Sequence, residues 1–421
     1  MNILALDVAV GKVLATVLNT DTAARGGAAT QATFTIDEPA PEASEIPTER
    51  LWQAVTSAAR AAVRASGVSG RMGQDIEAVT LSCFDSGLVL LDKKDQPLRP
   101  IWTNKDRRAR PAARQVWAAV GQEFLNTAGN RPLPGLITAV SLRHMLTLDP
   151  YLLHEVRTYL HINGWLGLVI TGAKAFDPAN ASYTGLFGTI TDHRWSQRWC
   201  DYFEVDMNWL PQVISGDAEL GTVRAGIASE LGVPAGIPCK IGGAANTRWM
   251  LAAGMKRGDL LHDSGEMQIL TALTEKPRPA PERLTHLLGV HDAYVQTTFN
   301  PVGTPALGWL HRLCFRELSR DDFYAQSIPM ALERSTRITL DPPYLSGNPL
   351  DIEAQRASFR DLELNTDRLD LLAALLQTLI RRQRDASAAL GTPIQRVFFK
   401  GDDIELWRRL LPEYKDVSQV I

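Results

Sequence analysis

The stretch Lys240–Gly254, KIGGAANTRWMLAAG, has the residue types of a phosphate-binding turn. It predicts a buried strand end, a Gly/Ala-rich turn and the start of a helix. Backbone N–H groups in such turns cradle phosphates. Phosphoryl transfer also needs a carboxylate that accepts a proton, yet the centre of this turn is Asn246, and an amide has no useful basicity. The turn is therefore an active site, a damaged one, or a helix N-cap, where Asn is also favoured.

Two carboxylates stand at the ends of other predicted strands. Asp7 ends the apolar run of the first strand, and Asp85 directly follows the strand IEAVTLSC. A polar side chain that follows a buried strand is a candidate for contact with a ligand. The sequence alone leaves the ordinary alternative, a turn-capping Asp, open at Asp7.

The elements that position these residues alternate between strands and helices. Residues 2–10 and 12–20 predict two strands joined by a tight turn at Val10–Gly11. Thr48 begins a predicted helix that runs through Gly67, with apolar residues every three or four positions. Residues 151–171 predict mostly helix.

The second half of the chain repeats this pattern of strands followed by helices. The segment LHDSGEMQILTALTEK predicts a hairpin, and a long helix is predicted from Asp367 to Leu390, capped by Thr366. Each half begins with strands and Gly-rich turns and ends with helices, so the sequence predicts two α/β domains.

Composition excludes several classes of protein. The chain has 421 residues, 45% of them hydrophobic and 22% charged, as in an ordinary globular protein of two domains. A net charge of -3 gives no basic surface for nucleic acid. The four cysteines lack the spacing of a zinc site or a disulfide scaffold. With no signal-peptide pattern and no apolar run long enough to span a membrane, a cytoplasmic protein without a membrane partner is expected.

Several segments, in order, resemble the FGGY family of carbohydrate kinases, which have the actin-like, ribonuclease-H-like ATPase fold. The segments are LALDVAVGKVLATVLNTD for the first phosphate loop, GLVLLDKKDQPLRPIWTNKDRRA for the sugar-facing segment, TGAKAFDPANASYTGLFG, and VFFKGDDIELWRRLLPE for the adenosine segment. The stretch AANTRWMLAAG…HDSGEMQIL is most similar to the rhamnulokinase and fuculokinase branch. The resemblance covers nearly the whole chain.

The resemblance implies an architecture and an activity. It implies an α/β protein of two ribonuclease-H-like domains, residues 1–238 and 239–421, with an interdomain cleft. The implied reaction transfers the γ-phosphoryl group of ATP, with Mg²⁺, to a hydroxyl of a small sugar or polyol. A homodimer is compatible with the family. The alternative is a catalytically impaired homologue that binds a sugar as a sensor or scaffold.

The resemblance also assigns roles to residues. Asn246 takes the position of the family's catalytic Asp, and Asp7 is directed at Mg²⁺. The residues expected to bind nucleotide and phosphate are Gly11, Lys12, Ser264, Gly265, Glu266 and Gly401. Those expected to bind sugar are Asp85, Trp102, Asp106 and Arg107, with Asn104 the competing position for Asp106.

Four departures from the family pattern lie on the nucleotide side. Ala9–Val10 replaces hydroxyl residues of the first phosphate loop, and Asn246 replaces the acid. Glu266 replaces a hydroxyl, and together with Asp263 it would repel a triphosphate. Only Gly401 is left of a Gly-Gly-Gly turn that lets the backbone approach the purine. Family members usually continue beyond Ile421 with another helix, so the expectation is a truncated second domain and an incomplete adenine pocket. These departures favour the sensor alternative.

Overall fold

A mixed sheet that begins with the N-terminal hairpin forms the centre of the first half of the chain. In this computed structural model, β1 (Asn2–Ala9) pairs antiparallel with β2 (Lys12–Asn19) and parallel with β6 (Ile76–Cys83). The strand order is β10-β11-β6-β1-β2-β3, with β4 also paired to β2. The bounds of the other strands are Ala24–Arg25 for β3, Thr30–Thr33 for β4, Glu219–Thr222 for β10 and Pro238–Ala244 for β11.

The structure describes residues 1–21, 24–25, 29–67, 75–265, 267–290, 293–345, 347–401, 403–412 and 418–419. The chain divides into two units: Met1–Ala252 with His286–Ala293, and Ala253–Thr285 with Tyr294–Ile421. The first unit therefore runs past residue 238, where the sequence analysis puts the boundary between two domains; that boundary stays a prediction. Among the described residues, no helix is long and apolar enough to cross a membrane.

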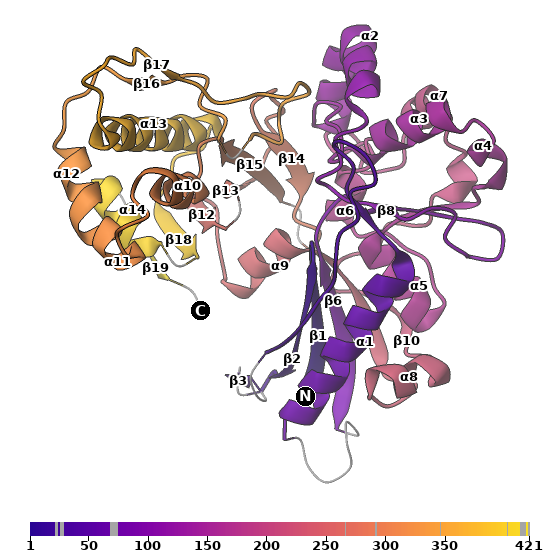
Figure 1. The fold of residues 1–421 in the computed structure, drawn as a ribbon. Helices are drawn as coiled ribbons and strands as arrows, with labels where there is room; N and C mark the ends of the chain where they lie inside the picture. Colours follow the sequence, from indigo (N-terminus) through magenta and orange to yellow (C-terminus); the bar gives the residue numbers. More distant parts are fainter. Residues whose placement is uncertain are drawn as a thin grey trace. The chain divides into compact units, whose positions relative to one another are not determined.

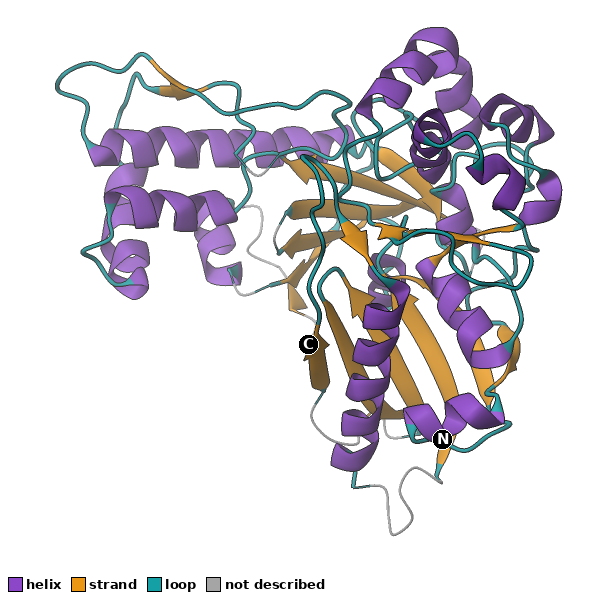
Figure 2. Ribbon diagram, turned by 45° about the vertical axis from the view of Figure 1, so that its right-hand side comes forward, coloured by secondary structure: helices purple, strands orange, loops and turns teal. Residues whose placement is uncertain are grey.

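Helices cover the first sheet (Figures 1 and 2). α1 (Thr48–Ala65) packs on β1, β2 and β4, as its predicted apolar face requires. The residues of that face, all buried, are Leu51, Val55, Ala59 and Val63. α5 (Ile162–Thr171) packs on β6, β10 and β11. α8 (Ala225–Leu231) contacts α1, and α9 (Ala245–Ala252) follows β11 directly.

A second, smaller sheet in the first unit has the order β5-β8-β7-β9. Its strands are Glu45–Ile46 for β5, Leu88–Leu91 for β7, Ile101–Trp102 for β8 and Thr158–His161 for β9. The helices of this part are Arg110–Ala128 for α2, Thr138–Leu148 for α3, Leu152–Glu155 for α4, Pro178–Ser182 for α6, Gln197–Phe203 for α7 and the 3-10 turn Met207–Trp209 for η1. The prediction of mostly helix over residues 151–171 was wrong in its middle, because β9 is buried and pairs with β7 there.

The second unit is built around a sheet of order β14-β15-β13-β12-β18-β19. Its strands are Leu284–Leu287 for β14, Tyr294–Asn300 for β15, Gln268–Thr274 for β13, Asp259–Ser264 for β12, Arg396–Lys400 for β18 and Ser418–Gln419 for β19. The helices are Pro305–Cys314 for α10, Arg320–Asp322 for α11, the π-helix Phe323–Ser327 for η2, Ile328–Leu332 for α12, Arg368–Ala389 for α13 and Ile404–Leu410 for α14. A short ribbon pairs Thr339–Leu340 (β16) with Phe359–Arg360 (β17).

The two units repeat one strand topology. In the first unit β4-β2-β1-β6-β11 has two antiparallel pairings followed by two parallel ones. In the second unit β15-β13-β12-β18-β19 has the same sequence of pairings. This repeat is the duplicated α/β arrangement that the sequence predicts, and in both units the same edge of the sheet collects the carboxyl ends of three parallel strands.

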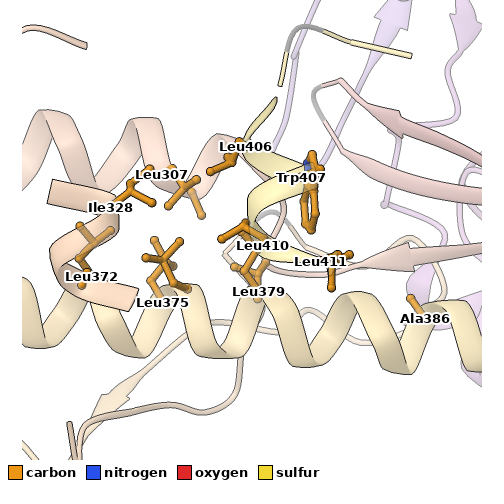
Figure 3. Close-up of a cluster of buried hydrophobic side chains, with 14 of the residues drawn as sticks. Leu307, Ile328, Leu372, Leu375, Leu379, Ala386, Leu406, Trp407, Leu410 and Leu411 are labelled. Atoms are coloured by element: carbon orange, nitrogen blue, oxygen red, sulfur yellow. The ribbon is translucent and has the colours of Figure 1, made fainter. Parts of the chain in front are cut away.

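The hydrophobic core of the second unit forms where α13 faces α10, α12 and α14 (Figure 3). Leu372, Leu375 and Leu379 lie one or two turns apart on α13 and are fully buried. The predicted helix is present, but its cap is Asp367 rather than Thr366. The Asp367 carboxylate accepts hydrogen bonds from the N–H groups of Leu369 and Asp370. The Asp370 carboxylate in turn accepts a hydrogen bond of 3.0 Å from the Asp367 N–H, which completes a capping box.

Candidate functional site

The carboxyl ends of β1, β6 and β11 bring three predicted site residues to one edge of the first sheet. Asp7 of β1 is aligned with Ser82 of β6, and Ala244 at the end of β11 is aligned with Cys83. Asp85 lies two residues beyond the end of β6, and Asn246 lies two residues beyond the end of β11. In open α/β sheets, ligands bind outside the carboxyl ends of the strands, so this edge is the candidate active site of the first unit.

Asp7 is half-buried and accepts a hydrogen bond of 2.9 Å from the Ser82 hydroxyl. No group of three His, Cys, Asp or Glu side chains within the described ranges could hold a metal ion by itself. Mg²⁺ is usually bound by one or two carboxylates together with water and substrate phosphates. A single carboxylate at the strand edge therefore fits Mg²⁺ that arrives with a nucleotide, and the assignment of Asp7 as its ligand stays a prediction.

The turn between β1 and β2 has the tight geometry that the sequence predicts. Gly11 has a φ of +85°, which favours glycine, and its carbonyl accepts a hydrogen bond of 2.9 Å from the N–H of Phe34. Lys12 is exposed at the start of β2. Contact of either residue with phosphate is a prediction that the geometry leaves open.

The turn after β6 is strained. Ser86 has a φ of +64°, a conformation that costs a non-glycine residue about 1–3 kcal/mol and that is concentrated at functional sites. Its side chain is fully buried, and its hydroxyl has no hydrogen-bond partner in the described part of the chain. The neighbouring Asp85 is half-buried, and burial, with a smaller effect of Asp177, raises its pKa to about 6. Sequence reasoning missed Ser86, because neither its φ nor its buried hydroxyl can be read from residue type.

Asn246 lies in the first turn of α9, half-buried. Because α9 begins at Ala245, Asn246 lies inside the helix rather than before it, unlike an N-cap. The adjacent Thr247 is buried, and its hydroxyl has no partner among the residues the structure describes. β11 leads into this turn through Gly242, which has a φ of +71° at a register shift against β6. The backbone at Gly242 thus fixes the position of the first turn of α9, which carries Asn246.

A buried carboxylate, Asp177, holds the loop that follows α5. It is the N-cap of α6 and accepts hydrogen bonds from the Asn180 N–H at 3.1 Å, from the Asn180 side chain at 2.7 Å and from the Asn163 side chain. Burial raises the pKa of Asp177. Its oxygens are therefore engaged within the fold.

The predicted sugar-side residues Trp102, Asp106 and Arg107 make many contacts with their own segment. The Arg108 guanidinium lies 3.7 Å from the centre of the buried Trp102 ring. Asp106 is buried, pairs with Arg108 at 2.7 Å and accepts a hydrogen bond of 2.9 Å from the Ser44 N–H.

Arg107 donates to the carbonyls of Asn104 at 2.6 Å, Asp106 at 3.0 Å and Pro134 at 3.0 Å. Burial lowers the pKa of Arg107 to about 10. These contacts hold the segment in place, and the sugar-binding roles of Trp102, Asp106 and Arg107 stay predictions.

In the second unit, the ends of β12 and β18 place Ser264 beside Gly401. The strands are parallel, and Asp263 is aligned with Lys400. A Cβ on Gly401 would lie 2.4 Å from the Ser264 hydroxyl, and Gly401 has a φ of +130°, so only glycine fits here. Lys400 pairs with Asp263 at 2.7 Å, which balances the charge of one of the two carboxylates that were expected to repel a triphosphate. Glu266 lies outside the described residues.

A pocket of about 330 Å³ lies in the second unit. It is lined by Ser264, Gly265, Thr304, Pro305, Gly308, His311, Arg312, Arg320, Tyr324 and Asp403. The hydroxyls of Ser264 and Thr304 are buried and have no partner within the described ranges. Arg320 lies 3.6 Å from Asp403, and the first turn of α10 forms part of the wall.

This pocket combines hydroxyl groups, two guanidinium groups and a helix N-terminus, which together suit a phosphorylated ligand. Ser264 and Gly265 were predicted from the sequence to bind phosphate, whereas Thr304, Arg312 and Arg320 were not. In the stretch NPVGTPALGWL, a Thr-Pro pair before an apolar helical run is a visible sign of a helix N-terminus.

Residues 2–250 match the sequence model of the FGGY family of carbohydrate kinases, N-terminal domain. The chain therefore belongs to the FGGY family, as its resemblance predicts. Curated relatives include erythritol kinase of Brucella abortus, 26% identical over 50% of this chain and 41% of the relative, and L-fuculokinase of Haemophilus influenzae, 22% identical over 66% of this chain and 59% of the relative. The chain spans less than half the length of the first curated relatives that it matches.

Solved structures share the fold over nearly the whole chain. Xylulose kinase from Rhodospirillum rubrum has a TM-score of 0.87 at 20% identity, over 98% of this chain and 84% of that one. Plasmodium falciparum glycerol kinase with ADP has a TM-score of 0.81 at 16% identity, over 96% of this chain and 82% of that one. At these identities the likeness shows the fold, and it confirms the predicted actin-like, ribonuclease-H-like class.

Proposed function

We propose that this chain is an ATP-dependent kinase that transfers the γ-phosphoryl group to a hydroxyl of a small sugar or polyol. The observation that carries the proposal is the pocket of the second unit, in a chain that belongs to the FGGY family. The Ser264 and Thr304 hydroxyls have no partner among the residues that the structure describes, and a bound nucleotide would satisfy them, since buried polar groups in native proteins are nearly always hydrogen-bonded.

The nucleotide takes the second-unit pocket in this proposal. Its volume of about 330 Å³ is at the lower end of the range of small-molecule sites, which is about 300–1,000 Å³. The guanidinium of Arg312 and the Ser264–Gly265 turn are available to phosphate oxygens, while Gly401 permits close approach of the backbone. The predicted Glu266 contact stays a prediction.

The first unit supplies the groups that act on the acceptor and the metal. Asp7 would hold Mg²⁺, which when bound neutralises the charge of the nucleotide phosphates. Gly11 and Lys12 are proposed to face phosphate from the turn between β1 and β2. Asp85 is proposed as the sugar-side carboxylate, because no cation in the described part of the chain pairs with it, whereas Asp106 is paired with Arg108.

Titration calorimetry with Mg·ADP, followed by a coupled assay of ATP consumption with xylulose, erythritol and glycerol, tests the proposal. Micromolar binding of Mg·ADP and acceptor-dependent ATP consumption are the expected results. Binding of a sugar or polyol without any nucleotide binding would refute the kinase and support the sensor alternative instead.

A further inference from the structure

The amide at Asn246 leaves the proposed reaction without the usual proton acceptor at that position. A transfer to a hydroxyl still requires a group that takes the hydroxyl proton, and loss of such a group typically costs about 10²–10⁴-fold in rate. A working enzyme with this sequence must therefore place another base at the same edge of the sheet.

The carboxylates near that edge are not equally available. Asp177 is engaged by three donors from Asn163 and Asn180. Asp7 accepts the Ser82 hydroxyl and is the candidate for Mg²⁺. Within the described ranges, no Lys, Arg or His side chain pairs with Asp85.

The strand register brings Asp85 and Asn246 to neighbouring strand ends at one edge of the sheet. β6 and β11 are parallel neighbours whose aligned ends are Cys83 and Ala244. Asp85 and Asn246 each follow their aligned residue by two positions, and α9 packs against β6. A carboxylate on the segment after β6 and one on the segment after β11 therefore both lie at this edge of the sheet.

The local structure around Asp85 also points to a ligand. The adjacent Ser86 is held at a φ of +64°, and its fully buried hydroxyl has no partner within the described residues. Strain of this kind persists where the surrounding structure enforces it, commonly at functional sites. A substrate hydroxyl bound at this turn would supply the partner that the Ser86 hydroxyl lacks.

The geometry points to Asp85 as the general base of the proposed phosphoryl transfer, replacing the carboxylate absent at Asn246. The inference rests on the proposed function. The acceptor hydroxyl gives its proton to the Asp85 carboxylate as its oxygen bonds to the γ-phosphorus, and the bond from that phosphorus to the bridging oxygen of ADP breaks. Because burial raises the pKa of Asp85 to about 6, the carboxylate is ionised at neutral pH and more basic than an exposed Asp.

Two variants test this role in the full chain, with xylulose, erythritol and glycerol as acceptors and Mg·ATP as donor. Asp85→Asn should lower kcat by about 10²–10⁴-fold while the KM for ATP stays within about threefold. The double variant Asp85→Asn, Asn246→Asp should have a kcat at least about tenfold higher than Asp85→Asn alone, because a carboxylate then follows the neighbouring strand end. Asp201→Asn, an exposed Asp on α7, is the matched control and should leave kcat unchanged.

The pH profile separates a base from a structural residue. In the unsubstituted protein, kcat/KM should fall below about pH 6 as Asp85 takes up a proton, and Asp85→Asn should remove that acidic limb. Asp177 raises the pKa of Asp85, and Asp85 in turn raises the pKa of Tyr183, and both of these neighbours remain in the variant. A limb that survives in Asp85→Asn would therefore belong to another group and overturn the assignment.

The outcomes also separate this inference from the proposed function. Equal activity of Asp85→Asn and the unsubstituted protein overturns the inference and leaves the kinase intact. An unsubstituted protein that binds Mg·ADP but transfers nothing, while Asn246→Asp does transfer, likewise overturns the inference. Absence of both nucleotide binding and transfer in every variant overturns the proposed function and the inference with it.

Discussion

Substitution of Gly242 by Ala tests how closely the backbone that carries Asn246 approaches the neighbouring strand. A Cβ at Gly242 would lie 1.6 Å from the carbonyl oxygen of Leu81, and the φ of this residue is +71°. The clash is with backbone, so no side-chain rotation relieves it. β11 would have to move away from β6, at the point where it leads into α9.

The expected cost has two contributions. An L-residue in the left-handed region costs about 1–2 kcal/mol. Forcing extra volume into a closely packed position costs about 1–3 kcal/mol more. We therefore expect Gly242→Ala to lower the free energy of unfolding of the first unit by about 2–5 kcal/mol.

Urea unfolding followed by tryptophan fluorescence measures this cost. Of the ten tryptophans only Trp309 and Trp407 lie in the second unit, so the signal reports chiefly on the first. The matched control is Gly226→Ala in α8, where an added Cβ meets nothing within 4 Å. That change should stabilise the unit by about 0.5–1 kcal/mol, because Ala favours helix over Gly. Equal stability of the two variants would refute the argument from close approach.

Three further predictions concern the second unit. Leu375→Ala should lower the free energy of unfolding by about 2–5 kcal/mol in urea titrations, because it opens a cavity in the core of Figure 3. Leu364→Ala, at an exposed site, should change it by less than about 0.5 kcal/mol. Arg312→Ala should weaken Mg·ADP binding by about tenfold or more in calorimetry, because a cation lining the pocket is lost, and Arg316→Ala, outside the pocket, should leave the affinity unchanged. Burial lowers the pKa of His262 to about 3, so near pH 5 the imidazole binds a proton only in the unfolded chain. The free energy of unfolding, measured by hydrogen exchange of β12, should therefore fall by about 1.4 kcal/mol per pH unit from about pH 6 to 4. His262→Gln should show a flatter dependence on pH.

The fold could be predicted from the sequence wherever local pattern and burial agree. The apolar positions of α1 and the leucines of α13 follow helical spacing and are buried on the predicted faces. β9 was missed because its four residues are all buried and continue directly into the apolar helix α5, so no alternation marks the strand. The cap of α13 was displaced by one residue, since a Thr and an Asp stand side by side and both are good N-cap residues.

The candidate site was predictable in its residue types but less so in its contacts. Asp7, Asp85 and Asn246 could be chosen because polar residues stood at strand ends, and the parallel register then explains why they share an edge. The ion pair of Lys400 with Asp263 depends on two strands that are far apart in the sequence. The left-handed conformation of Ser86 has no signature in residue type, since Ser is not among the residues that favour positive φ.

The contacts show that the departures from the family pattern differ in how strongly they would impair nucleotide binding or proton transfer. The negative charge of Asp263 is balanced by Lys400, and Gly401, which the family resemblance assigns to an adenosine-binding turn, is at the position where a side chain would collide with Ser264. These two features leave the pocket of the second unit compatible with an anionic ligand. The amide at Asn246 removes a base from one strand end, but the adjacent strand end carries a carboxylate that no cation in the described chain neutralises. An Asn at the family's acid position is therefore insufficient to predict an inactive protein, because parallel neighbouring strands offer two places from which a carboxylate can reach the same edge.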